Sequence, residues 1–168
     1  MRIKDRILEG ALKENLFHIE KIISGGQTGV DRAALDVALE LGISCGGWCP
    51  KGRKAEDGPI DARYPLQETT SARYPIRTEK NVKESDGTLI LTWAHPTGGT
   101  ALTIRFAQKH KKPCWVVDLS VGGDPETVEE WEKMNRIKVL NVAGPPESNV
   151  PGIYGHAVKF LRDILNRL

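Results

Sequence analysis

Strand patterns and amphipathic helix patterns alternate along almost the whole chain, and this alternation constrains the fold more than any other feature. After each strand pattern, apolar residues recur every three or four positions, which is the spacing of a helix with one buried face. Strands that alternate with helices form parallel sheets, because each crossover helix returns the chain to the same edge. The sequence therefore predicts an α/β fold, a three-layer Rossmann-like parallel sheet with helices on both faces. The short apolar runs that carry this prediction lie at 18–24, 43–48, 86–93, 113–120 and 137–143.

The helices are marked by one-sided apolar spacing and by residues that begin or end them. In the first crossover, apolar residues recur every three or four positions up to Leu41, and Gly42 is a typical stop. Asp124 and Pro125 open the helix before the last strand. The other helices are expected around 78–85, within 95–112 and at 153–168.

The chain is predicted to contain one domain and a helical extension. Residues 1–17 place apolar side chains on one face, so an N-terminal helix is expected there. Residues 18–168 suffice for a single Rossmann-like ligand-binding domain but not for two ordinary ones. Residues 49–72 are rich in proline, glycine and charge, which is typical of a functional or mobile loop.

Composition excludes several kinds of partner. A formal charge of +2 provides no global field for nucleic acid or a membrane surface, so neither is expected. The first residues carry charges and lack the apolar stretch of a signal peptide. No apolar run approaches the roughly 18 residues of a membrane span. Three cysteines without an export signal indicate reduced thiols, so a cytoplasmic location is expected.

The first strand is followed at once by the glycine-rich segment SGGQTG, residues 24–29. Backbone N–H groups and the positive end of a helix at such a turn suit a phosphate. The dinucleotide fingerprint G-x-G-x-x-G is only partly met, because Ser24 replaces its first glycine. The acid expected about 20 residues later is also missing, so NAD is not expected. No Lys-Ser or Lys-Thr follows the glycines, which excludes a P-loop.

Explanations without a ligand remain open for this segment. Thr28 and Asp31 have the spacing of a capping box, which would account for both residues. Gly25 and Gly26 would also serve close packing of the strand on its helix. Arg32 is either a ligand contact or a surface ion-pairing residue.

A second glycine turn, TGGT at 97–100, follows the third strand. We expect the strand order 2-1-3-4-5, which makes strands one and three neighbours and directs both turns into one cleft. Such a cleft suits a ligand with a phosphate and a flat ring. Thr100 would cap its helix, and Thr103 would face either the cleft or solvent.

The segment at 48–58 adds local positive charge. Lys51 and Arg53 would clamp an anionic ligand if this loop covers the cleft, and the alternative is a solvated charged loop. Cys45 and Cys49 have no matching Cys or His pair, so no metal site is predicted. No nucleophile elbow and no acid–base pair stand out, so no catalytic residue is predicted either.

Five sequence blocks together resemble the molybdenum carrier family, which is related to the molybdenum cofactor carrier proteins of green algae. The resemblance covers roughly residues 18–166. It implies a Rossmann-like fold shared with the lysine-decarboxylase-like, or "lonely guy", enzymes, and a homo-oligomer. It also implies that the cargo is molybdenum cofactor, a pterin with a dithiolene and a terminal phosphate. The blocks are SGGQTGVDRAALDVALELG, GWCPKGRKAEDG, YPIRTEKNVKESDGTLIL, TGGTALT and NVAGPPES followed by PGIY.

The cytokinin-activating phosphoribohydrolases of this wider superfamily provide a contrast. They carry an arginine, then Ser-Asp, then P-G-G-x-G-T-x-x-E. Arg77, nine residues before Asp86, is similar in position to their catalytic arginine. Thr103 stands where their catalytic glutamate stands, so the resemblance implies the binding half of that site without its chemistry.

The sequence therefore predicts a binding and carrier protein for molybdenum cofactor, or for molybdate or phosphate, with no obvious catalytic machinery. The alternatives are a nucleotide sensor or phosphoribohydrolase-like enzyme, and a partner-binding module. Molybdoenzymes or cofactor biosynthesis proteins would be its protein partners. The predicted ligand-binding residues are Ser24, Gly25, Gly26, Gln27, Thr28, Gly29, Arg32, Lys51, Arg53, Arg77, Gly98, Gly99, Thr100 and Thr103.

Overall fold

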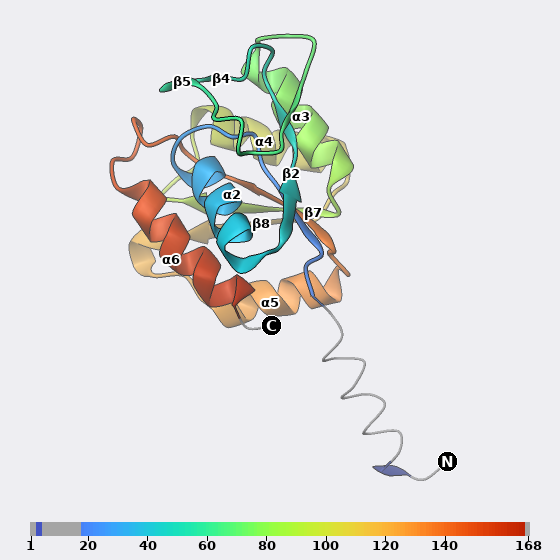
Figure 1. Ribbon diagram of the computed structural model, residues 1–168. Coiled ribbons are helices and arrows are strands. Elements are labelled where there is room, and N and C mark those ends of the chain that lie inside the picture. Colours follow the sequence, from blue (N-terminus) through green and yellow to red (C-terminus); the bar gives the residue numbers. More distant parts are fainter. Residues whose placement is uncertain (1–2, 5–17, 167–168) are drawn as a thin grey trace.

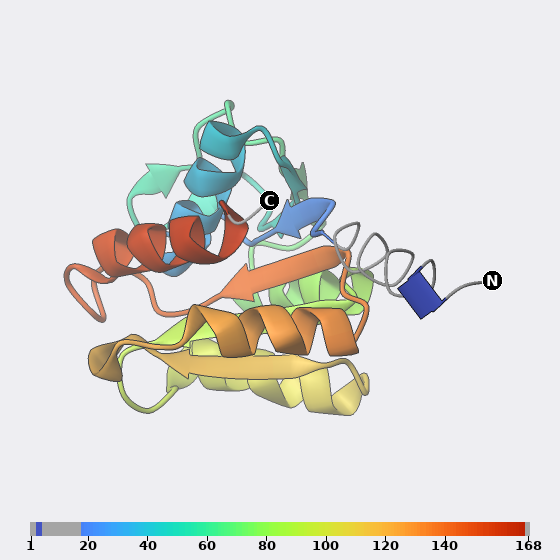
Figure 2. The same ribbon diagram turned by 90° about the horizontal axis from the view of Figure 1, so that it is seen from below.

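A central sheet of five parallel strands forms the middle layer of the protein (Figures 1 and 2), which confirms the predicted α/β class. The computed structural model describes residues 3–4 and 18–166, so most of the helix expected over 1–17 lies outside the described residues. The strands of this sheet are β1 (Lys21–Ile23), β2 (Ser44–Gly46), β7 (Gly87–Thr92), β8 (Cys114–Asp118) and β9 (Val139–Ala143).

Helices cover both faces of this sheet. Helices α2, α5 and α6 lie on one face, and α3 and α4 lie on the other (Figures 1 and 2). Gly42 ends α2 in the left-handed conformation, and the Asp124 carboxylate accepts the Glu126 N–H at the start of α5, as the sequence indicated. No helix within the described ranges is long and apolar enough to span a membrane. The helices are α2 (Val30–Leu41), α3 (Tyr74–Glu84), α4 (Gly98–Lys109), α5 (Pro125–Met134) and α6 (Ile153–Leu165), with a 3-10 turn at Leu119–Val121.

The strand order is β2-β1-β9-β7-β8, so the predicted order 2-1-3-4-5 is wrong. The last strand, β9, pairs with both β1 and β7 and separates them. The Asp86 carboxylate fixes this position, because it accepts the N–H groups of Lys138 and Val139 at 3.0 and 2.8 Å. An apolar run shows that a strand is buried but does not say which strand lies beside it.

The observed order is a circular permutation of a familiar one. If β9 is counted first, followed by β1, β2, β7 and β8, the order reads 3-2-1-4-5, that of a doubly wound sheet. The direct link from α6 to β1 is absent in this chain, and a link from α5 to β9 replaces it. The topological switch therefore lies between β9 and β7, and a ligand crevice is expected at their carboxyl ends.

The loop predicted at 49–72 is an ordered lobe. It contains two small sheets, β3 (Trp48–Cys49) with β6 (Gln67–Glu68), and β4 (Lys54–Ala55) with β5 (Gly58–Pro59). The lobe packs against α2 through a small apolar cluster of its own. The buried members of that cluster are Leu35, Cys49, Ala55, Ile60, Tyr64 and Leu66.

Arg53 organises the lobe from within. Its guanidinium donates to the carbonyl oxygens of Ile60 and Asp61 at 2.8 Å, Tyr64 at 2.9 Å and Leu66 at 3.2 Å. These bonds use four of the five N–H donors of the group that was expected to clamp an anion. Arg53 is therefore a structural residue, which corrects its prediction as a ligand contact.

Replacing Arg53 with methionine should lower the free energy of unfolding by about 3 kcal/mol, because several carbonyl groups lose a charged donor. Urea unfolding followed by circular dichroism measures this change. Lys51→Met is the matched control: the Lys51 side chain is exposed, so its loss should change stability by less than about 0.5 kcal/mol. Equal stability of the two variants would contradict the structural role of Arg53.

Candidate functional site

A cleft of about 560 Å³ opens at the carboxyl ends of β9 and β7, where the strand order places the topological switch. Its walls come from α3, the lobe, and the loops that follow β1, β7 and β9. It is lined by Gln27, Glu56, Tyr74, Arg77, Thr92, Trp93, His95, Thr97, Gly99, Thr100, Gly144, Pro145, Pro146, Asn149 and Val150.

The second glycine turn borders open space. A Cβ atom added at Gly98 or Gly99 would meet no other atom within 4 Å. Thr97 is the N-cap residue of α4, yet its side chain makes no capping hydrogen bond, and Thr100 lies inside the helix instead of capping it. The first N–H groups of a helix have no partner within the helix, and the helix dipole makes this end positive. The turn is therefore shaped and charged to hold an oxyanion.

The first glycine turn is filled by the protein itself. An added Cβ at Gly26 would lie 2.6 Å from Leu66, and one at Gly29 would lie 2.4 Å from the Pro145 carbonyl oxygen. That same carbonyl accepts the N–H of Val30 at the start of α2. The glycines of this turn thus permit close packing, which was the alternative explanation. Of the two glycine turns that were predicted to meet in one cleft, only the second is open.

The Thr28–Asp31 pair is not a capping box. Gly29 is the N-cap residue of α2, and it has no side chain with which to cap. Thr28 Oγ1 donates to the Glu56 carboxylate and accepts the Glu147 N–H at 3.1 Å. Both bonds join Thr28 to other loops instead of to its own helix.

Asp31 forms a buried ion pair with Arg77. Arg77 Nη1 lies 3.0 Å from Asp31 Oδ2, and their side chains are 12% and 3% exposed. Burial raises the pKa of Asp31, and the charge of Arg77 opposes that rise. Gly25 is required beside this pair, because an added Cβ would overlap Arg77 Nη1. Arg77 also lines the cleft, with its guanidinium 5.7 Å from the centroid of the Tyr74 ring.

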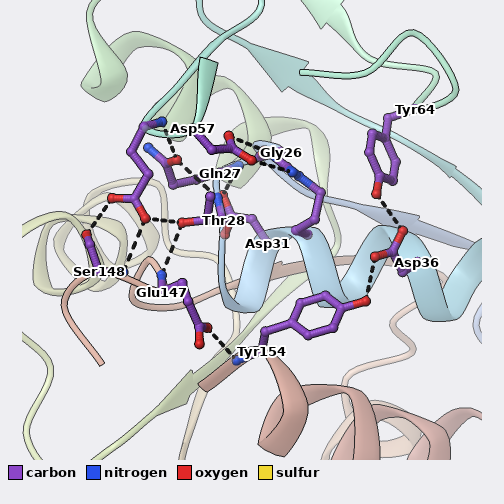
Figure 3. A network of polar contacts seen from close by, with 12 residues as sticks. Gly26, Gln27, Thr28, Asp31, Asp36, Asp57, Tyr64, Glu147, Ser148 and Tyr154 are labelled. Carbon is purple, nitrogen blue, oxygen red and sulfur yellow. Dashed lines mark hydrogen bonds and ion pairs between the residues drawn. The ribbon is translucent and has the colours of Figure 1, made fainter. Parts of the chain in front are cut away.

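Glu56 lines the cleft and joins three loops, and its partners Thr28 and Ser148 are labelled in Figure 3. Its carboxylate accepts from Thr28 in the loop after β1 and from the N–H and hydroxyl of Ser148 in the loop after β9. Gln27 Oε1 in turn accepts the N–H groups of Glu56 at 2.9 Å and Thr28 at 3.0 Å. Bonds from the Ser148 and Thr28 hydroxyls lower the pKa of Glu56, so this carboxylate is ionised at neutral pH.

Further polar contacts hold the lobe against α2 (Figure 3). Arg32 donates twice to the Gly26 carbonyl and pairs with Asp57 of the lobe at 3.1 Å, as its ion-pairing alternative anticipated. Asp36 accepts from the hydroxyl groups of Tyr64 and Tyr154 at 2.6 and 2.7 Å. The lobe is thereby tied to both α2 and α6.

The remaining predicted residues lie apart from the cleft. Ser24 is fully buried below it, and the exposed Lys51 is absent from its lining. Thr103 is buried, faces neither cleft nor solvent, and donates to the Gly99 carbonyl at 2.9 Å. In residues 3–4 and 18–166, no cluster of three or more His, Cys, Asp or Glu side chains is placed to hold a metal.

Trp93, an aromatic residue that was not among the predicted ones, forms part of another wall of the cleft. Trp93 is 39% exposed, and its ring centroid lies 4.7 Å from that of His156. The next residue, Ala94, has a φ of 63°, and its N–H donates to Asp118 at 2.9 Å, which holds the loop in this conformation. The only sequence signal for this wall is a tryptophan directly after a buried strand.

The comparisons with known proteins agree with the permuted strand order. The model of the circularly permutated YpsA SLOG family matches residues 22–165. The chain belongs to this family. A neighbour with a solved structure also matches the chain.

That neighbour is a protein from Syntrophus aciditrophicus SB, described as a "Putative molybdenum carrier protein". It is 47% identical to this member of the permutated YpsA family, with a TM-score of 0.85. The match covers 88% of this chain and 95% of the neighbour. The resemblance to the molybdenum carrier family is thereby confirmed. None of the curated proteins compared matches the chain.

Replacing Arg77 with methionine would leave Asp31 buried without its partner, so the free energy of unfolding at neutral pH should fall by about 3–5 kcal/mol. The double variant Asp31→Asn/Arg77→Met should recover more than half of this loss. The pKa of the unpaired Asp31 would rise further. The penalty of the single variant relative to the wild type therefore grows as pH increases from the wild-type to the variant folded-state pKa, both of which lie above the unfolded value. Urea unfolding between pH 4 and 7 (roughly the range spanned by these ionisations) measures both effects. A penalty that does not change with pH would contradict the ion pair.

Proposed function

We propose that this member of the permutated YpsA family is a carrier protein that binds molybdenum cofactor in the cleft between β9 and β7. The observation that carries this proposal is the open glycine turn at the amino end of α4, where a Cβ added at Gly98 or Gly99 would meet no protein atom within 4 Å. The name of the Syntrophus neighbour supports a ligand that contains molybdenum.

Different residues of the cleft would bind the phosphate and the pterin of the ligand. The terminal phosphate would bind the N–H groups of Gly98 and Gly99 and the side chain of Thr100, with Arg77 adding positive charge. The flat pterin would lie against the Tyr74 and Trp93 side of the cleft, because aromatic rings bind flat rings by stacking. Molybdate or phosphate alone would occupy only the α4 end of this space. As proposed, the carrier is a cytoplasmic homo-oligomer that serves molybdoenzymes or cofactor biosynthesis proteins.

The test is to identify what co-purifies with the protein. The wild type should retain molybdenum, measured by mass spectrometry, and pterin, measured by the fluorescence of its oxidised form, after anaerobic purification from a host that makes the cofactor. Gly99→Val should reduce both at least tenfold, since a side chain would occupy the oxyanion position.

The matched control is Gly155→Val. Gly155 is also a helical glycine whose added Cβ would meet no atom within 4 Å, but it does not line the cleft. This variant should retain both molybdenum and pterin. Retention of the cofactor by Gly99→Val, or its loss from Gly155→Val alone, would contradict the proposed site.

The second candidate function is nucleotide hydrolysis, which is favoured by Arg77 lining the same cleft as the α4 turn. Thr103 provides no carboxylate, and its hydroxyl is bonded to Gly99. Nucleoside monophosphates incubated with the protein should therefore release no free base in a chromatographic assay. Robust release that Arg77→Lys abolishes would favour the enzyme over the carrier.

A further inference from the structure

The two walls of the cleft differ in charge. The amino end of α4 provides positive potential from the face of the sheet that α3 and α4 cover. Glu56 is bonded to the loops that lead into α2 and α6, which cover the opposite face. Its carboxylate is ionised, because bonds from Ser148 and Thr28 lower its pKa. A ligand that reaches from one wall to the other therefore meets the positive amino end of α4 at one side and the negative Glu56 carboxylate at the other.

Glu56 retains hydrogen-bonding capacity toward the cleft. A carboxylate offers about four acceptor positions. Three are occupied, two on Oε1 by Thr28 and the Ser148 N–H, and one on Oε2 by the Ser148 hydroxyl. One acceptor position on Oε2 remains for a ligand, and Glu56 is part of the cleft lining.

Gln27 places a donor beside this acceptor. Its Oε1 accepts two backbone N–H groups, which fixes the orientation of the amide. The amide nitrogen has no hydrogen-bond partner within residues 3–4 and 18–166. Glu56 and Gln27 thus provide an acceptor and a donor in the lining of the same cleft, and the Glu56 N–H is itself bound to Gln27.

From this arrangement we infer that Glu56 determines specificity: the cleft selects phosphate esters whose distal heterocyclic ring donates an N–H group. The inference rests on the proposed function, because it takes the phosphate to lie at the α4 turn. A ring with an N–H donor next to an acceptor, as in nucleobases and pterins, satisfies both Glu56 and Gln27. A ring without such a donor leaves the remaining acceptor position of the exposed carboxylate to solvent, and a bare oxyanion gains nothing from it.

Isothermal titration with a series of probes tests the inference. The series is inorganic phosphate, ribose 5-phosphate, purine riboside 5′-monophosphate, AMP and GMP. Purine riboside 5′-monophosphate is AMP without its amino group, so its ring has no N–H. We expect it to bind about tenfold more weakly than the tighter of AMP and GMP, which is the effect of one hydrogen bond to a charged group.

Two variants distinguish the effect of the Glu56 charge from the effect of the hydrogen bond that holds Glu56 in place. Glu56→Gln removes the charge, and it should reduce the tenfold preference to less than about twofold. Ser148→Ala removes the hydroxyl donor to Glu56 but keeps the carboxylate, so the preference should persist. The inference is overturned if Glu56→Gln keeps the preference or if Ser148→Ala loses it to the same extent.

Failure of the proposed function has a different signature. If Gly99→Val binds AMP and GMP as tightly as the wild type, or if none of the probes binds the wild type, the phosphate does not lie at the α4 turn. Two results together support both the proposed function and the role of Glu56. The affinity for AMP and GMP depends on Gly99, and the preference over purine riboside 5′-monophosphate depends on Glu56. A Gly99-dependent affinity without any preference between the probes overturns the inference about Glu56 alone.

Discussion

The pairing of β9 with both β1 and β7 is the constraint on which the site depends. Because β9 lies between them, the two glycine turns do not end neighbouring strands. The loop after β9 instead lies against the first turn, with the Pro145 carbonyl bonded to the start of α2. The second turn has no such neighbour, and the cleft opens there. The position of one strand thus decides which glycine turn packs against the protein and which one stays open.

The two glycine turns, at 24–29 and 97–100, are similar in sequence but have different structural roles. In the first turn, glycine allows protein atoms to approach more closely than any side chain would permit. In the second, glycine leaves the N–H groups at a helix end uncovered. Charged residues around the cleft are divided in the same way. Arg53 and Arg32 hold the lobe in place, whereas Arg77 is paired with Asp31 and also reaches the cleft.

The sequence predicted the features that depend on local patterns. Apolar periodicity gave the α/β class, and Gly42 and Asp124 marked helix ends correctly because caps depend on a few adjacent residues. The strand order was wrong because no local pattern encodes which strands pair. Glu56 was missed for the same reason: its partners Thr28 and Ser148 are distant in the chain, and an isolated glutamate in a charged loop resembles any solvated residue. Apart from its place after a buried strand, nothing in the local sequence singles out Trp93, because its neighbour His156 is distant in the chain.

The most direct test of the account is the response of individual backbone amides to inorganic phosphate, followed by 1H–15N nuclear magnetic resonance. We expect the largest chemical-shift changes at the Gly98 and Gly99 amides, whose turn is open, and small changes at Gly26 and Gly29, whose turn is filled. The largest changes at Gly26 and Gly29, with Gly98 and Gly99 unaffected, would contradict it.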